Sequence, residues 1–166
     1  MGTEQMQQAL EASLINVKAH QETFRQENLD ALRPFCSDES VAAFFTKFSF
    51  DEEVKIGEFT LRQSNCLKKN IDWEDDFKRA LMVNLLPVGS GVSGDIVVLD
   101  LLKFKTGVLF HDYFLERETE NPRKFLVEMA CTLGEFYLNS VQIPDYPIDA
   151  YEAAELMGAD FTGYSD

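Results

Sequence analysis

Hydrophobic residues in the first part of the chain recur every three or four positions, which is the spacing of one face of an α-helix. This pattern predicts a helix from residue 4 to about residue 32. The pattern weakens over residues 19–22, so two helices separated by a kink are an alternative. Pro34 cannot continue a helix and is expected to end this segment. A second helix is expected over residues 37–48, with these positions on its buried side: Val41, Phe44, Phe45 and Phe48.

The spacing of hydrophobic residues then changes from helical to alternating, which is typical of β-strands. Residues 53–61 alternate on either side of Gly57 and predict a strand or a tight hairpin with a bulge. Residues 64–80 predict short helical turns, in which Trp73 and Phe77 are one turn apart and face inward.

Three strands are expected next, over residues 80–88, 95–102 and 108–114, and their short connections predict an antiparallel meander. Asn121 and Pro122 form a suitable N-cap and first position for a last long helix. The apolar side of that helix would consist of Phe125, Leu126, Met129, Leu133, Phe136 and Tyr137.

The order of these elements predicts an α+β fold, with a central, mostly antiparallel sheet and with N-terminal helices and a closing C-terminal helix packed around it. The tail over residues 144–166 contains one short candidate helix that ends at Gly158, followed by an acidic end. No segment of the 166 residues has the composition of a linker, so we expect one domain spanning residues 1–166.

The loop between the first two strands of the meander contains Gly89, Gly91 and Gly94 in the spacing G-x-G-x-x-G. A dinucleotide-binding fingerprint requires a helix directly after the glycines, whereas a β-branched strand sequence follows here. A Walker loop would require Gly-Lys-Ser/Thr, and a kinase would require an Asp-Phe-Gly motif, and the sequence has neither. We therefore expect these glycines to give a hairpin loop positive φ angles and a bulge.

Candidate catalytic and metal-binding residues are few. In the expected strand, the adjacent His111 and Asp112 would point to opposite faces and could not pair. A histidine packed at a sheet edge is the favoured interpretation over a lone general base. Cys36, Cys66 and Cys131 are far apart along the chain and form no C-x-x-C pair, so we expect reduced thiols and no metal site. The sequence thus predicts no enzyme and no cofactor.

The charge of the chain is strongly negative, with 29 acidic and 15 basic residues, a formal charge of −14 and a pI near 4.5. Such a field repels nucleic acid and anionic lipid and attracts cationic partners. A role in solubility alone is the competing interpretation. No apolar run is long enough to span a bilayer, and the first residues lack the pattern of a secretory signal, so we expect a cytoplasmic protein.

Several short motifs follow one another in a set order through the middle of the chain. They are a Leu-Pro before a glycine-rich turn, a Gly-Asp entering a strand, an Asp near the end of that strand, and a Gly-Val strand with a following His. These motifs are Leu86-Pro87, Gly94-Asp95, Asp100, Gly107-Val108 and His111. In this order they resemble the SUKH superfamily, which includes bacterial immunity proteins and a fungal cell-wall synthesis regulator.

The resemblance covers roughly residues 35–140, with the N-terminal helix and the acidic tail as additions. It implies structural roles for the motif residues, with Gly94 turning the chain and Asp95 bonding nearby loop amides. It also implies a non-enzymatic protein-binding module, typically an immunity protein that neutralises a cognate toxin such as a basic nuclease.

An acidic face with aromatic anchors would suit such a partner. The candidate binding residues are Asp72, Trp73, Glu74, Asp75, Asp76, Asp112, Tyr113 and Glu116. Trp73 could equally be a core residue. A regulatory or scaffold protein of the same fold with a non-toxin partner is the alternative function, and a small-ligand binder or enzyme that uses the glycine loop and His111 is the third. The oligomeric state and the partner's identity stay open.

Overall fold

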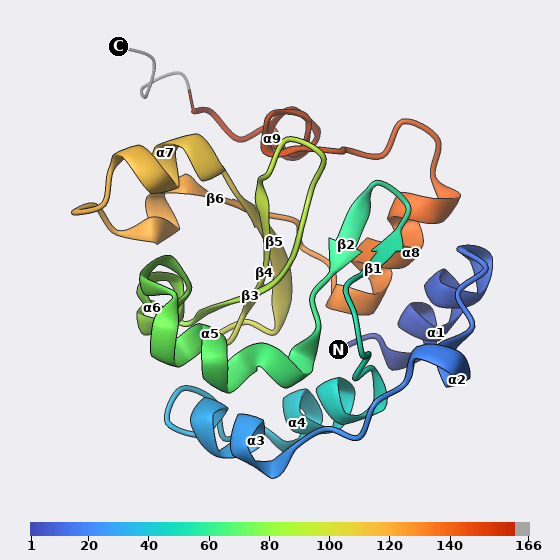
Figure 1. The fold of residues 1–166 in the computed structure, drawn as a ribbon. Helices are drawn as coiled ribbons and strands as arrows, with labels where there is room; N and C mark the ends of the chain where they lie inside the picture. The colour runs from blue at the N-terminus through green and yellow to red at the C-terminus, as the bar shows by residue number, and fades with distance from the viewer. Residues whose placement is uncertain (162–166) are drawn as a thin grey trace.

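A computed structural model of the chain describes residues 1–161, apart from the side chain of His20. Its centre is a six-stranded antiparallel sheet whose strands pair in chain order, as Figure 1 shows. The protein therefore has the expected α+β class with an antiparallel meander. The strands are β1 (Val54–Ile56), β2 (Phe59–Leu61), β3 (Leu85–Ser90), β4 (Ile96–Asp100), β5 (Lys105–Leu109) and β6 (Leu126–Glu128).

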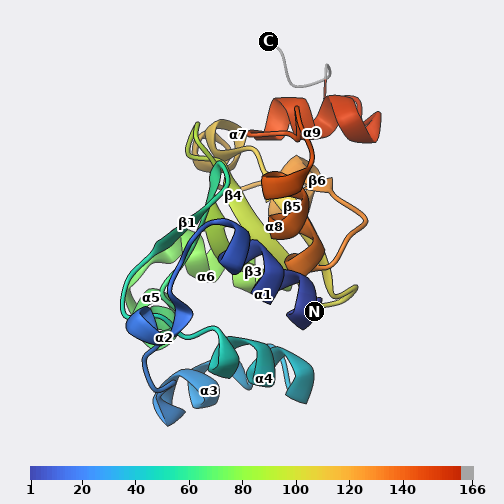
Figure 2. The ribbon, with the colours of Figure 1, turned by 90° about the vertical axis from the view of Figure 1, so that its right-hand side faces the viewer.

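Helices surround this sheet on its sides and at both ends. Figures 1 and 2 show α7 and α9 at one end of the sheet and α3 and α4 at the opposite end, while α1 packs against α8 beside the sheet. Among the described residues, no helix has both the length and the apolar character needed to cross a membrane. The α-helices are α1 (Thr3–Ala12), α2 (Val17–His20), α3 (Gln26–Leu32), α4 (Glu39–Lys47), α5 (Leu67–Trp73), α6 (Asp75–Met82), α7 (His111–Glu116), α8 (Leu133–Gln142) and α9 (Ala150–Met157), with 3₁₀ turns η1 (Ser64–Cys66) and η2 (Pro122–Phe125).

The helix expected over residues 4–32 is in fact three helices, so both the single helix and the two-helix alternative are wrong. Leu14 follows α1 with φ of 58°, a left-handed conformation that ends the helix. After α2, the backbone N–H of Glu22 donates to the carbonyl of Ser49 at 2.9 Å, and Gln21 forms a bridge with Phe50. Long-range pairing of this extended segment replaces the local helical hydrogen bonds.

The next two predicted elements, a helix and a hairpin, are confirmed, except that the hairpin pairs without the expected bulge. Helix α4 begins after Asp38, whose side chain accepts a hydrogen bond from the backbone of Ser40 at 2.8 Å. All four residues expected on its inner side are buried. Strands β1 and β2 form a hairpin around Gly57, which has φ of 63°, the left-handed region that glycine enters at no steric cost.

Two predicted elements in the second half of the chain are wrong. The strand expected over 108–114 ends at Leu109, and the chain then turns into α7. The helix expected from Asn121 is only the turn η2, because the following residues pair with β5 as strand β6. The capping box of Thr132 and Glu135 starts the true closing helix, α8.

Smaller differences concern element boundaries. Helix α6 extends to Met82, so the strand expected from residue 80 starts only at Leu85. Asn84 makes the turn between them with φ of 61°. The short helix expected to end at Gly158 is confirmed as α9, with Gly158 in the left-handed conformation at its end. The acidic end of the tail, residues 162–166, lies outside the described residues.

Candidate functional site

The glycine loop does not have the geometry of a phosphate cradle. The expected positive φ is present at Gly94, at 88°, but the expectation is wrong for Gly89 and Gly91. The expected bulge is present, since the register between β3 and β4 shifts between Pro87 and Gly89. Gly89 allows β2 and β3 to lie close together, because a Cβ atom there would lie 2.0 Å from the carbonyl oxygen of Thr60. A strand follows the loop, so no helix N-terminus points at it.

Asp95 joins two helices to the sheet. It lies directly before β4 and is 2% exposed. Its Oδ1 accepts a hydrogen bond from the backbone N–H of His111 at 3.0 Å, and its Oδ2 accepts one from the backbone N–H of Ala150 at 2.7 Å. His111 and Ala150 are the first residues of α7 and α9, so one carboxylate satisfies an otherwise unpaired amide at the start of each helix.

The ring of His111 is held between two carboxylates. Its Nδ1 lies 2.9 Å from Oδ1 of Asp95, and its Nε2 lies 2.9 Å from Oδ1 of Asp112. The expectation that His111 and Asp112 point to opposite faces is therefore wrong, because these residues form the first turn of a helix rather than part of a strand. Both ring nitrogens are engaged by neighbours within the fold, and the ring connects α7 to the buried Asp95.

Asp100, at the other end of β4, is bound by a guanidinium group. Arg123 donates to both carboxylate oxygens of Asp100, at 2.8 and 2.9 Å, and its Nε donates to the carbonyl of Val83 at 2.8 Å. Burial alone would raise the pKa of Asp100, but the hydrogen bonds from Arg123 and from the backbone of Leu102 outweigh it, so the pKa is lowered. This pair attaches η2 and the end of α6 to the sheet.

The other two motif residues, Gly107 and Pro87, have packing roles. A Cβ atom at Gly107 would lie 2.4 Å from Cδ1 of Leu126 and 3.1 Å from the carbonyl oxygen of Val127, so glycine lets β6 lie beside β5 without displacing the leucine side chain. Pro87 faces Val98 across the β3–β4 ladder, next to the bulge.

The predicted acidic face at the α5–α6 corner is largely neutralised by basic neighbours. Lys68 forms an ion pair with Asp72, and this bond raises the pKa of Lys68. Two further pairs are present: Arg62 lies 3.3 Å from Glu74, and Arg79 lies 3.5 Å from Asp76.

The aromatic residue at that corner does not face inward. Trp73 is 82% exposed, whereas Phe77, one turn further on, is buried. The prediction that both pack in the core is therefore wrong for Trp73. Its role as a binding anchor stays a prediction.

The predicted binding residues on α7 form a separate group. Asp112 and Glu116 are exposed, but Tyr113 is half-buried between Phe110 and Phe125. Trp73 is the last residue of α5, and α6 lies between α5 and α7, as Figure 1 shows. Arg79 of α6 donates to the backbone carbonyl of Phe114 in α7. The two predicted anchors thus lie on different helices.

The most one-sided charge lies in a part of the chain that sequence reasoning did not select. Lys124 is the last basic residue, so residues 125–161 contain acidic side chains and no Lys, Arg or His. Glu128 among them pairs with Lys103 of the β4–β5 turn. In the sequence, this acidic segment is recognised by its lack of basic residues and not by consecutive acidic ones. Its acidic residues are Glu128, Glu135, Asp145, Asp149, Glu152, Glu155 and Asp160.

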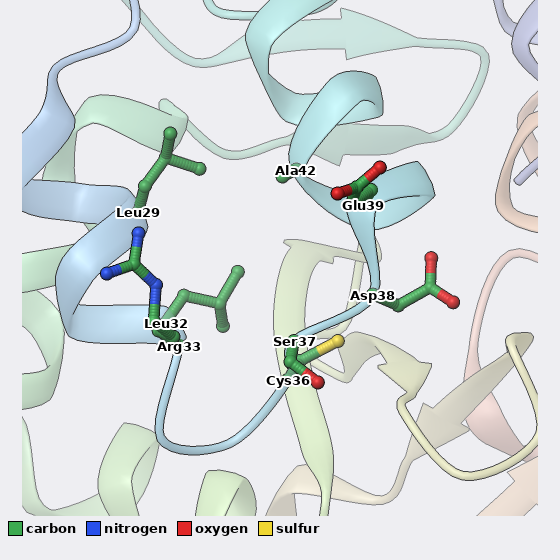
Figure 3. Close-up of a pocket in the computed structure, with 8 residues that line it drawn as sticks. All are labelled: Leu29, Leu32, Arg33, Cys36, Ser37, Asp38, Glu39 and Ala42. Carbon is green, nitrogen blue, oxygen red and sulfur yellow. The ribbon is translucent and has the colours of Figure 1, made fainter.

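A hollow of about 240 Å³ lies between α3 and α4, and Figure 3 shows the side chains around it. Two of its charged residues are used within the fold, since Arg33 lies 3.3 Å from Asp30 and Asp38 caps α4. Cys36 lines it as a free thiol. Within residues 1–161, no group of three or more His, Cys, Asp or Glu side chains is placed to hold a metal ion.

Comparisons with protein-family models, with curated proteins and with solved structures found no match to this chain. The fold and the side-chain geometry therefore define the class as an α+β protein built on a six-stranded antiparallel meander.

Proposed function

We propose that this protein is a non-enzymatic protein-binding module of the SUKH type, an immunity protein that binds and neutralises a basic, nuclease-type toxin domain in the cytoplasm. The exposure of Trp73 is the observation that carries the proposal. A tryptophan in water leaves a large apolar surface unburied, and tryptophan is among the residues that contribute most when protein interfaces form.

The charge of the molecule supports a basic partner. A formal charge of −14 attracts a cationic protein from a distance and raises its association rate at low salt. A nuclease domain is basic where it binds phosphate, so an acidic inhibitor that covers this surface would also exclude the nucleic acid.

The contacts of His111, the candidate general base, support a structural rather than a catalytic role for this residue. Its two nitrogens lie against Asp95 and Asp112, and the ring helps to join α7 to the sheet. The alternative function is a regulatory or scaffold protein of the same fold, for which Trp73 would serve a non-toxin partner.

The test is a titration with the protein encoded beside this one, at low and at moderate salt. We expect Trp73→Ala to weaken the complex about tenfold or more. Leu14→Ala is the matched control, because Leu14 is 93% exposed on the α1–α2 connection, and it should bind as the wild type does. Loss of the partner's nuclease activity on binding would support the immunity role.

Two outcomes would count against this function. A complex that forms without inhibiting the partner would favour the regulatory or scaffold alternative. Equal affinities for Trp73→Ala and Leu14→Ala would remove Trp73 from the interface.

A further inference from the structure

A second hollow, which we call the α9 groove, lies between α9 and the chain that leads into it. Its volume is about 520 Å³. In Figures 1 and 2 this region is at the end of the molecule opposite α3 and α4. The groove is lined by Asp145, Tyr146, Pro147, Ile148, Glu152, Glu155 and Leu156.

The groove has an apolar lining that the fold leaves partly open to solvent. Helix α9 packs on the sheet through small residues, with Ala150, Ala153 and Ala154 buried. The larger apolar residues at the end of the same helix are less buried: Leu156, which lines the groove, is 58% exposed, and Met157 is 38% exposed. A short helix that buries only alanines and exposes larger apolar residues leaves apolar surface available for another molecule.

The charged groups of the groove are all acidic. Three of its seven lining residues are carboxylates, and none is basic. Glu152 is fixed at the wall, because its carboxylate accepts a hydrogen bond from the backbone of Ile148 at 3.1 Å. Since residues 125–161 contain no Lys or Arg, no base from this part of the chain can neutralise Asp145 or Glu155. The α5–α6 corner differs, because three of its carboxylates have basic partners.

We propose that the α9 groove binds a basic segment of a partner protein. An apolar side chain of that segment packs against Ile148 and Leu156, and flanking Arg or Lys side chains face Asp145 and Glu155. Charge complementarity selects this occupant, because an acidic or neutral segment would leave the carboxylates of the groove without counter-charges. The inference rests on the proposed function, because it takes the partner to be a basic protein. It places one contact with that partner in the α9 groove, away from Trp73.

The test uses the full chain, labelled with ¹⁵N, and a six-residue peptide of alternating Arg and Leu as the probe. We expect the backbone amide signals of residues 145–157 to shift during the titration. A peptide of alternating Arg and Ser should bind more weakly, because it lacks the apolar anchor. A peptide of alternating Glu and Leu should not bind.

A pair of charge-reversing variants tests the position of the site. Glu155→Lys should weaken the Arg-Leu peptide about fivefold or more at low salt. Glu11→Lys changes the net charge equally, at an exposed position near the end of α1 where a lysine favours the helix dipole, and should have a much smaller effect. Equal effects of the two variants, shifts confined to other residues, or equal binding of the Arg-Ser peptide would overturn the proposal.

The outcome can be separated from that of the proposed function. If the neighbouring protein binds in a Trp73-dependent manner while the peptide shifts no signal in residues 145–157, the α9 groove is refuted and the proposed function stands. If the peptide binds the groove while Trp73→Ala has no effect on the neighbouring protein, the groove stands and Trp73 is not part of the interface.

Discussion

Asp95 and Asp100 lie at the two ends of strand β4 and are equally buried, but their partners differ. Asp100 receives two hydrogen bonds from the guanidinium of Arg123, so a full positive charge balances it. Asp95 receives hydrogen bonds from two backbone amides at helix starts and faces the ring of His111. The amides of helix N-termini carry only partial positive charge.

This difference separates the two ends of the sheet in the way their charge is balanced. The Asp100 end is held by an ion pair that is complete within the fold. The Asp95 end holds α7 and α9 in place, and the groove beside α9 adds three carboxylates and no basic residue among those that line it. Both ends stabilise the fold, and the cationic partner that we propose would meet carboxylates without a basic lining residue at the second.

The largest effect should come from removing the guanidinium at the Asp100 end. Arg123→Met leaves a buried carboxylate without its counter-charge and the carbonyl of Val83 without a donor. We expect the free energy of unfolding to fall by about 3–5 kcal/mol, measured by urea denaturation. Lys124→Met, at the next residue, is the control, because its partner Glu120 is on the surface and stability should stay near that of the wild type.

Removing the Asp95 side chain should reduce the free energy of unfolding less than removing Arg123 does. The effect should be confined to α7 and α9. Asp95→Ala removes the acceptor for the first amides of α7 and α9, and we expect a loss of about 2–3 kcal/mol. Hydrogen exchange should show reduced protection in these two helices and retained protection in α8. Equal loss of protection in all three would mean that Asp95 does not act through the two helix starts.

Acidic pH offers a graded way to remove the Asp100 contribution. The folded pKa of Asp100 is lowered, so its stabilising effect is present above the ordinary pKa of an aspartate and is lost as the pH falls through the folded value. The stability difference between wild type and Asp100→Asn should therefore be constant from pH 7 to about 5 and should shrink below about pH 4. Urea midpoints over this range measure it. A difference that grew on acidification would contradict the assignment.

Much of the fold could be predicted from the sequence, because local patterns decided it. The helical spacing of Val41, Phe44, Phe45 and Phe48 identified α4, and the two-residue alternation around Gly57 identified the first hairpin. The errors came where distant contacts outweighed local ones. Leu126 to Glu128 were expected within a helix but pair with β5, and such a pairing leaves no local signature.

The candidate site was harder to predict, for physical reasons that particular residues show. Asp72, Glu74 and Asp76 were selected as part of a run of acids, but the folded chain brings Arg62, twelve residues away in the sequence, to Glu74. His111 and Asp112 were excluded as a pair only because α7 was taken for a strand. A sequence pattern shows which charges are present, whereas only the fold shows which of them are compensated.

The smallest of these effects concerns the turn that leads into Asp95. Gly94→Ala places a side chain at φ of 88°, but its Cβ would lie 3.7 Å from the His111 ring, an ordinary contact. The cost should therefore be backbone strain alone, about 1 kcal/mol in the free energy of unfolding. Gly158→Ala is the matched control, because Gly158 has φ of 62° and open space around it. A much larger loss of stability for Gly94→Ala than for Gly158→Ala would mean that the turn also sets the position of Asp95. Asp95 would then be held as firmly as Asp100, although no guanidinium binds it.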